Sequence, residues 1–286
     1  MRKVILPIVI VLLTLQICSF AVPPYYGNEI PIISSTKQFS FGFTFLSYEK
    51  YTIQSEEEYF IYELGVFSKY IPNKSVELSF YIPYLLMSNV NDYGILGDIK
   101  IFSKFALFSD LFQFIDTIYF NNSLVVNVSL ATGEKREDGY RNIGLDKGLY
   151  YPISSGYSDL DIGITSGLVF TYFSFFTSVV FISSSSKTEP PLAFNTENDS
   201  FKVGFTSEIF LFTSKNISIK PFLELTLIIP VSDKSKFLNS NVVGFGIWAK
   251  IVDSFVLKAG YYQNLNKIID ERYVGNIIST SFEYRF

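Results

Sequence analysis

The stretch ISTSFEYRF at residues 278–286 divides its side chains into two sets with a period of two residues. One set is apolar or aromatic apart from one threonine: Ile278, Thr280, Phe282, Tyr284 and Phe286. The residues between them are two serines, a glutamate and an arginine. Because successive side chains of a β-strand point to opposite faces, this pattern predicts a strand with one aromatic face and one polar face.

The end of this strand resembles a known signal. A terminal phenylalanine with an aromatic residue two positions before it is similar to the sequence by which outer-membrane β-barrels are recognised by their assembly machinery. The resemblance implies that Phe282, Tyr284 and Phe286 form a C-terminal assembly signal, with the barrel-assembly machinery as a partner. An ordinary final edge strand that happens to end in phenylalanine is the alternative.

The same alternation recurs along the chain, most clearly where Phe39, Phe41, Phe43 and Phe45 are separated by polar or small residues. Such stretches begin near residues 37, 58, 75, 98, 115, 158, 172, 201, 216, 242, 255 and 275. Each is about ten residues long, the length at which a tilted strand crosses a bilayer. The stretch Tyr172–Ser183 is the least regular, because aromatic residues fall on both of its faces. We therefore predict an all-β fold, an antiparallel transmembrane β-barrel of about 12 strands (10–14) over residues 37–286.

The connections between these stretches alternate between long and short. Tight connections such as Ser214–Asn216 and Asp253-Ser254 are expected in the periplasm, and the long ones outside the cell. The long connections are Glu49–Glu57, Pro83–Gly97, Thr132–Tyr157, Ser183–Ser200, Pro230–Asn241 and Asn264–Val274. A barrel with one rim of turns and one rim of loops accounts for this alternation, whereas a soluble sandwich does not.

The N-terminus has the layout of a secretory signal peptide. Arg2 and Lys3 precede the apolar run Val4–Leu15, and Ser19-Phe20-Ala21 provides small residues for cleavage after residue 21. Residues 22–36 would then be a short periplasmic segment, and the mature chain would be delivered to the bacterial outer membrane. A membrane anchor and a lipoprotein signal ending at Cys18 are the alternatives.

Composition agrees with a protein whose outer face meets lipid. The chain is 48% hydrophobic and 18% aromatic but only 17% charged, against roughly 25% charged residues in an average soluble domain. In hydrocarbon every backbone polar group needs an internal partner, so strands can cross only as a closed barrel. Outer-membrane lipid is thus an expected partner.

Several kinds of chemistry are disfavoured. The chain contains no histidine, so the usual general base near neutral pH and imidazole metal sites are excluded. Cleavage after residue 21 would remove the only cysteine. We expect no catalytic residues, no metal site and no cofactor, and the lack of a basic cluster argues against nucleic acid as a partner.

Charged residues on the polar faces of the strands are candidates for lining a lumen. The candidates are Lys100, Lys104, Asp159, Asp161, Lys202, Glu208, Lys220, Glu224 and Lys250. With Glu63, Glu77, Glu283, Lys258 and Arg285, they make seven acidic and seven basic residues. This balance predicts either weak ion selectivity or a network of salt bridges across the lumen. Trp248 shares a face with Lys250, and we expect it to fill space near the rim.

Three segments carry a family resemblance. GILGDIKIFSKFAL (residues 94–107), LATGEK (130–135) and SSGYSDLDIG (154–163) together resemble the outer-membrane family of the phenol-degradation meta-pathway (MetA-pathway), a set of transporter-like barrels. Ser154-Ser155 departs from the pattern, since a glycine is expected there, and residues after 170 carry no motif of the family. The resemblance implies passage or binding of small solutes, including apolar ones.

Two functions from different classes follow. The first is a non-enzymatic channel or passive transporter for a small-molecule solute. The second is a structural or surface-interaction barrel with an occluded lumen, whose long loops bind a partner.

Overall fold

The computed structural model describes residues 38–51, 58–87, 94–107, 112–115, 118–130, 132, 158–185, 199–213, 217–231, 240–252, 254–265 and 273–286. The expected signal peptide, the segment 22–36 and most of the residues in the long connections lie outside this part of the chain. No helix long and apolar enough to cross a membrane occurs among the residues described.

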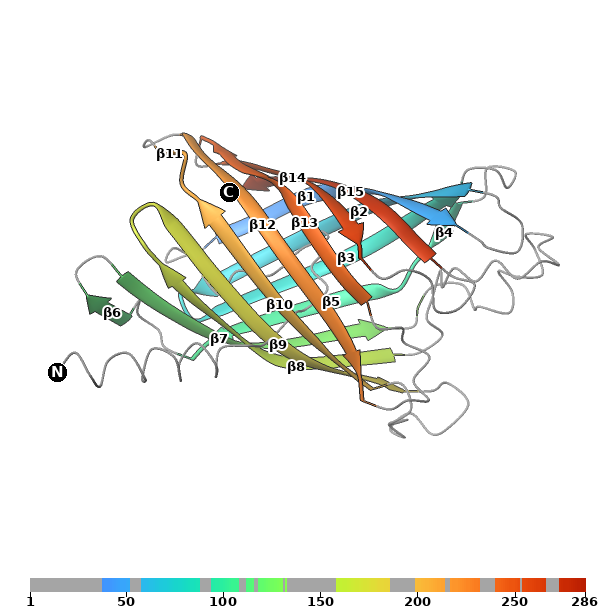
Figure 1. Cartoon of the computed structure of the whole chain (residues 1–286), viewed down its shortest axis with the longest axis horizontal. Coiled ribbons are helices and arrows are strands. Elements are labelled where there is room, and N and C mark those ends of the chain that lie inside the picture. Colours follow the sequence, from blue (N-terminus) through green and yellow to red (C-terminus); the bar gives the residue numbers. More distant parts are fainter. Residues whose placement is uncertain are drawn as a thin grey trace.

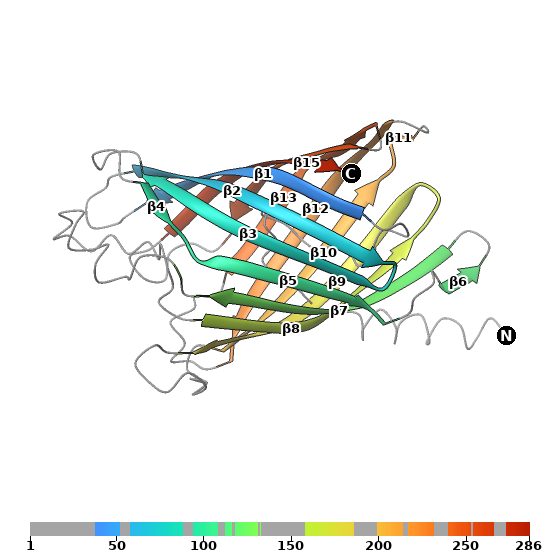
Figure 2. The same cartoon turned by 180° about the vertical axis from the view of Figure 1, so that it is seen from behind.

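Twelve long strands form the wall of a closed antiparallel β-barrel (Figures 1 and 2). They are β1 (Gln38–Tyr51), β2 (Glu58–Asn73), β3 (Val76–Met87), β5 (Ile99–Ala106), β7 (Ile118–Leu130), β8 (Ser158–Val169), β9 (Phe173–Ser185), β10 (Ser200–Ile209), β12 (Ile217–Pro230), β13 (Ser240–Ile251), β14 (Phe255–Asn264) and β15 (Tyr273–Arg285). Each pairs with the next along the chain, and β15 pairs with β1 from Arg285 opposite Ser40 to Tyr273 opposite Tyr51. The predicted fold class and strand number are confirmed.

Three short strands extend this wall. β4 (Gly94–Leu96) pairs with β3 and precedes β5, from which Gly97 and Asp98 separate it. β6 (Phe112–Ile115) pairs with β7, and β11 (Phe212–Thr213) pairs with β12. These short strands extend the pairing of neighbouring wall strands. They do not add further strands to the closed barrel.

Strand boundaries differ most from expectation at two places. β3 continues through Pro83 to Met87, where the sequence predicted a loop, because proline can take an extended conformation and its carbonyl accepts a bond from Gly97 N at 2.9 Å. The fifth wall strand begins at Ile118 and not near residue 115, since Phe112–Ile115 forms the separate strand β6. The uncertain stretch Tyr172–Ser183 is strand β9, which confirms that prediction.

Most short connections lie at one end of the barrel and most long ones at the other, as predicted. Only Lys74 and Ser75 separate β2 from β3, and three residues separate β8 from β9 and β13 from β14. We call the end that carries these turns the short-turn rim. The connection after β7, by contrast, occupies residues 131–157. Because the strands run antiparallel, this connection belongs to the opposite rim; the connection between β5 and β7, residues 107–117, is an exception, since it is long and belongs to the short-turn rim.

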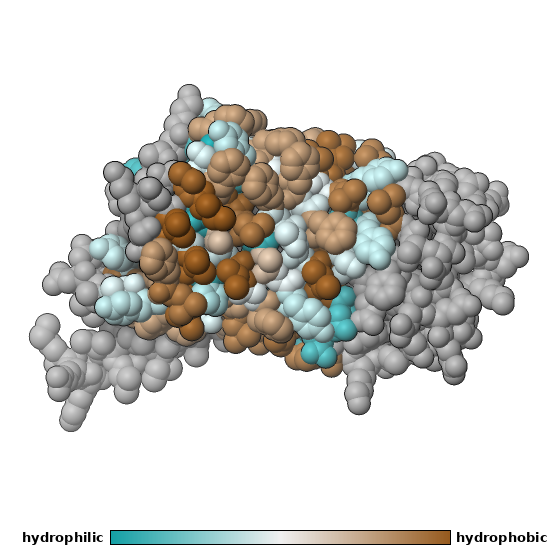
Figure 3. Space-filling model, turned by 90° about the horizontal axis from the view of Figure 1, so that it is seen from above, coloured by the Kyte–Doolittle hydropathy of each residue, from teal (hydrophilic) through white to brown (hydrophobic). Residues whose placement is uncertain are grey.

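The outer face of the barrel is apolar and the inner face is largely polar. On β1, Phe39, Phe41, Phe43 and Phe45 are exposed while the alternating Ser40 and Thr44 are buried. The same pattern on the other strands places a band of hydrophobic side chains over the described part of the outside (Figure 3). This arrangement suits a lipid environment, in which an apolar exterior carries no penalty.

Glycines on the inner face make room for aromatic rings. Gly42 lies opposite Phe67, and Gly244 opposite Tyr262, in the register of their strand pairs. A Cβ atom at Gly42 would overlap the Phe67 ring, and one at Gly244 would overlap the Tyr262 ring. The rings therefore lie over the backbone of the neighbouring strand, and Phe67 and Tyr262 are almost fully buried as a result.

Candidate functional site on the inner face of the barrel

The charged residues predicted to line the lumen lie on the inner face wherever the structure describes their side chains. The buried ones are Lys104, Asp161, Lys202, Glu208 and Glu224. Lys100, Lys220 and Lys250 are half-buried on the same face of their strands. Asp159 lies in β8 opposite Ser129, but its side chain is outside the described part, so its place on the inner face stays a prediction.

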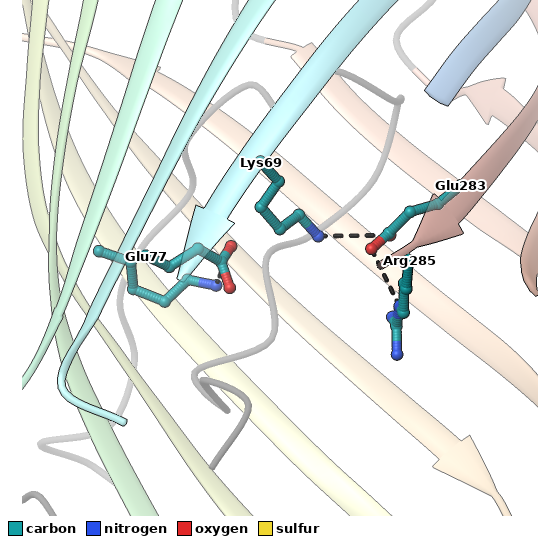
Figure 4. Close-up of polar contacts among 5 residues, drawn as sticks. Lys69, Glu77, Glu283 and Arg285 are labelled. Carbon is teal, nitrogen blue, oxygen red and sulfur yellow. Dashed lines mark hydrogen bonds and ion pairs between the residues drawn. The ribbon is translucent and has the colours of Figure 1, made fainter. Parts of the chain in front are cut away.

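One cluster of charges lies close to the short-turn rim. Lys69 Nζ is 3.4 Å from Glu283 Oε2, and Arg285 Nε donates to Glu283 Oε1 at 3.0 Å, so two cations from β2 and β15 share one carboxylate (Figure 4). Beside them Lys104 Nζ donates to Glu77 Oε1 at 3.2 Å, directly across the β3–β5 pair. Three cations thus face two carboxylates in this cluster.

A second cluster lies on β10, β12 and β14. Glu208 Oε2 accepts from Ser174 Oγ at 3.2 Å and lies 3.4 Å from Lys220 Nζ. Lys258 Nζ donates to Glu224 Oε1 at 3.1 Å, across the intervening strand β13. Each of the described ion pairs joins side chains of one strand, of adjacent strands or of strands separated by one other. These pairs therefore run along the wall, and a network of salt bridges across the lumen stays a prediction.

The lysines of the second cluster also lie over aromatic rings. Lys220 Nζ is 4.7 Å from the ring centroids of both Phe210 and Trp248, and Lys258 Nζ is 4.7 Å from that of Phe222. A cation at this distance from a ring face is attracted by the ring quadrupole. Trp248 lies on the inner face three residues from the end of β13, which agrees with its expected place near the rim.

Two apolar patches line the inner face on different parts of the wall. Phe67, Tyr81, Phe102 and Val125 form a buried cluster on β2, β3, β5 and β7. Phe222, Val242, Tyr262 and Ile277 form another on β12 to β15, with Trp248 packed against it. The inner face is therefore a polar wall with two apolar surfaces, one of which adjoins Lys220 and Lys258.

The first patch is joined to a buried carboxylate. The hydroxyl of Tyr81 donates to Glu63 Oε1, and it lies 3.1 Å from the hydroxyl of Thr44. Tyr81 and Glu63 are both buried. This contact satisfies the phenol, which would otherwise lose its hydrogen bond on burial.

Sequence reasoning missed three inner-face residues that shape this site. The candidates did not include Lys69, Phe67 and Tyr81. Lys69 is an even number of residues from Glu63 on β2, so the two side chains share a face, and Lys69 could have been found in this way. The alternation pattern was not used to assign the two aromatic residues to either face. The glycines opposite or diagonal to them, Gly42 and Gly65, are the signal that could have placed them inside.

The C-terminal residues take the arrangement that the sequence predicted. Phe282 and Phe286 are exposed on the outer face, where Phe286 and Tyr284 form an edge-to-face pair with centroids 4.7 Å apart. Phe286 N donates to Phe39 O at 2.8 Å, which ties the last residue to the start of β1. Recognition by assembly machinery stays a prediction.

No group of three or more potential metal-ligating side chains occurs in the described ranges. The comparisons with known proteins concern the fold. No protein-family model matches the sequence. No curated protein matches it.

The fold is that of outer-membrane β-barrels. The chain is similar to the crystal structure of an outer membrane channel from Pseudomonas putida F1, with a TM-score of 0.59 and 10% identity over 89% of this chain and 97% of that chain. The translocator domain of the autotransporter NalP from Neisseria meningitidis gives a TM-score of 0.47 at 9% identity, covering 89% of this chain and 91% of that one. The NanC porin gives 0.48 at 7% identity, covering 84% of this chain and 98% of that one. The resemblance to the meta-pathway family stays a prediction.

Proposed function

We propose that this protein is a bacterial outer-membrane channel or passive transporter for small solutes, including apolar ones. The observation that carries the proposal is a closed barrel with an apolar exterior and an inner face of polar, charged and aromatic side chains. The fold of the channel from Pseudomonas putida supports it. The half-buried Trp248, which packs against the second patch, gives an apolar solute a surface to contact, and the polar residues of the inner face can hold water.

The proposed activity is non-enzymatic and depends on lipid as the surrounding solvent. The chain has no histidine, so a histidine base cannot operate, and its outer face offers hydrocarbon-compatible side chains. Outer-membrane lipid, the barrel-assembly machinery and a small solute are the proposed partners. Delivery by the signal peptide at residues 1–21 completes the proposed route to the outer membrane.

The first test is conductance in a planar bilayer. The refolded mature chain is expected to insert and give discrete, stable current steps, because charged and hydroxyl side chains of the inner face can hold a water-filled path. Heat-modifiable migration on a gel checks separately that the barrel has folded. A folded barrel that inserts and never conducts, and that also fails to pass small solutes in a liposome assay, would overturn the proposal.

A second candidate function is favoured by close packing of the inner face. Ser123 and Thr165 are fully buried there, as are the rings of Phe67 and Tyr81. If side chains fill the lumen where these residues lie, the barrel is closed to solutes. Its function would then be structural, with long loops such as the one after Thr132 binding a partner. The recordings separate the two functions, since this one predicts insertion without current.

The proposed assembly signal can be tested by substitution at the C-terminus. Phe286→Ala is expected to remove most of the assembled barrel from the outer membrane of expressing cells, because the terminal aromatic residue is lost. Refolding of the same variant from urea into detergent should be nearly unchanged. Phe245→Ala is the matched control, since Phe245 is also an exposed phenylalanine of the outer face. Equal membrane levels of the two variants would contradict the assignment.

A further inference from the structure

The charges of the inner face are unevenly distributed along the barrel axis, although acidic and basic residues are nearly equal in total. We compare each residue by its distance from the short-turn end of its strand. Nine lie within four residues of that end: the bases Lys69, Lys104, Lys220, Lys250, Lys258 and Arg285, and the acids Glu77, Glu208 and Glu283. We call the six basic residues of this set the basic ring. They outnumber the three acids of the set by three.

The other half of the inner face has the opposite balance. Among the described side chains that lie six or more residues from the short-turn end, the acids are Glu63, Asp98, Asp161, Asp199 and Glu224, and the bases are Lys100 and Lys202. Five acids thus oppose two bases. The overall balance therefore hides a change of sign from one end of the lumen to the other.

Within the ion pairs that the basic ring makes, one of which joins Lys258 to Glu224 of the other half, the cation is usually the more exposed partner. The side chain of Lys220 is 22% exposed and that of Glu208 4%, and for Lys258 and Glu224 the values are 14% and 3%. Arg285 is 27% exposed against 9% for Glu283, and Lys104 with Glu77 is the exception at 7% against 13%. The carboxylates are held against the wall while most cations remain accessible. A solute at this level would therefore meet positive charge first.

Aromatic surface adjoins the accessible cations. Lys220 lies over Phe210 and Trp248, and Lys258 lies over Phe222. Phe222 belongs to the apolar patch that Trp248 packs against. A molecule at this place could contact the half-buried rings of Phe210 and Trp248 with an apolar body while its negative group lies near Lys220.

We propose that the basic ring selects small organic anions with an apolar body, such as aromatic carboxylates, at the short-turn end of the lumen. The inference rests on the proposed channel function and names its solute class. Net positive charge on the wall of a lumen raises the local concentration of anions. The acidic half lacks this effect, so the preference arises at one end of the barrel.

The first experiment measures the reversal potential of the conducting barrel in a gradient of potassium chloride. The permeability ratio of anion to cation should exceed one, and Lys220→Gln/Arg285→Gln should lower it by about twofold or more. The ratio should be larger in about 0.1 M than in about 1 M salt, where the screening length falls from roughly 10 Å to 3 Å. Lys74→Gln, in the turn of the same rim, is the matched control and should change the ratio less. A ratio of one or below in the parent protein overturns the inference.

If the double variant does not fold, Glu283→Gln gives a test of opposite sign. This variant removes an acid that lies beside the basic ring and leaves its two cationic partners, Lys69 and Arg285, in place. The permeability ratio of anion to cation should therefore rise above that of the parent. An unchanged or lower ratio contradicts the inference.

The second experiment does not need current. Trp248 is the only tryptophan of the chain, so its fluorescence reports binding beside Lys220 in the refolded barrel. Benzoate should change the emission at a concentration several-fold lower than benzyl alcohol or benzylamine, and the preference should be lost in Lys220→Gln. A conducting barrel without benzoate preference overturns the inference alone. A barrel that neither conducts nor prefers benzoate overturns the proposed function as well.

Discussion

Replacing Gly244 by valine is expected to destabilise the closed barrel strongly. A Cβ atom at this position would overlap the ring of Tyr262, which is 2% exposed and part of the apolar patch near Trp248. Forcing extra atoms into a packed interior costs about 1–3 kcal/mol and occasionally more. We expect a loss of about 3 kcal/mol in the free energy of unfolding, measured by urea titration of the barrel in detergent.

The clash itself can be separated from other effects of valine. In a Tyr262→Ala background the same glycine substitution should cost much less, because the ring that it displaces is absent. Ala249→Val is the control on the same strand, at a position of the outer face where no ring has to move. If Gly244→Val costs the same with and without the tyrosine ring, the explanation by ring packing is wrong.

Lys104→Met is expected to destabilise the barrel by about 3 kcal/mol, because it leaves the carboxylate of Glu77 buried without its 3.2 Å partner. Both side chains lie on the inner wall and are largely buried. Removing one member of a buried pair is costly mainly through the charge that remains. Urea unfolding in detergent measures the effect.

The companion variant Lys104→Met/Glu77→Gln should recover most of the lost stability, since it removes the remaining charge as well. The conservative Lys104→Arg keeps the cation and should be closer to the parent than Lys104→Met. A neutral effect of Lys104→Met, or a double variant as unstable as the single one, would show that the ion pair contributes little.

Much of the fold was predictable because few chain folds can satisfy their backbone hydrogen bonds inside a membrane. Alternation such as that of Phe39 to Phe45 places one set of side chains outside, and the alternation of long and short connections defines two rims. Strand starts were predicted well for the same reason. Pro83 was misplaced because proline is usually a sign of a strand end, whereas here its carbonyl keeps a bond to Gly97.

The site was less predictable, because its contacts depend on how strands are staggered. The alternation of side chains along each strand placed Glu224 and Lys258 on the inner face. Their contact across β13 follows from the shear of the closed sheet, which the alternation does not give. The same holds for Lys69 and Glu283, which are separated by β1. The total charge of the inner face could not predict the basic ring either, because a total does not contain the position of each charge along the barrel axis.

The seam between β1 and β15 has a consequence for how the protein is made. Its register joins residues from the two ends of the described barrel, such as Phe41 with Tyr284. A growing chain cannot form this seam until its last residues are synthesised, and until then two strand edges lack partners. Unpaired edges are costly in hydrocarbon, and contacts between distant residues form slowly. Membrane insertion should therefore follow completion of the chain, and a prematurely terminated product should be left outside the bilayer, accessible to periplasmic proteases.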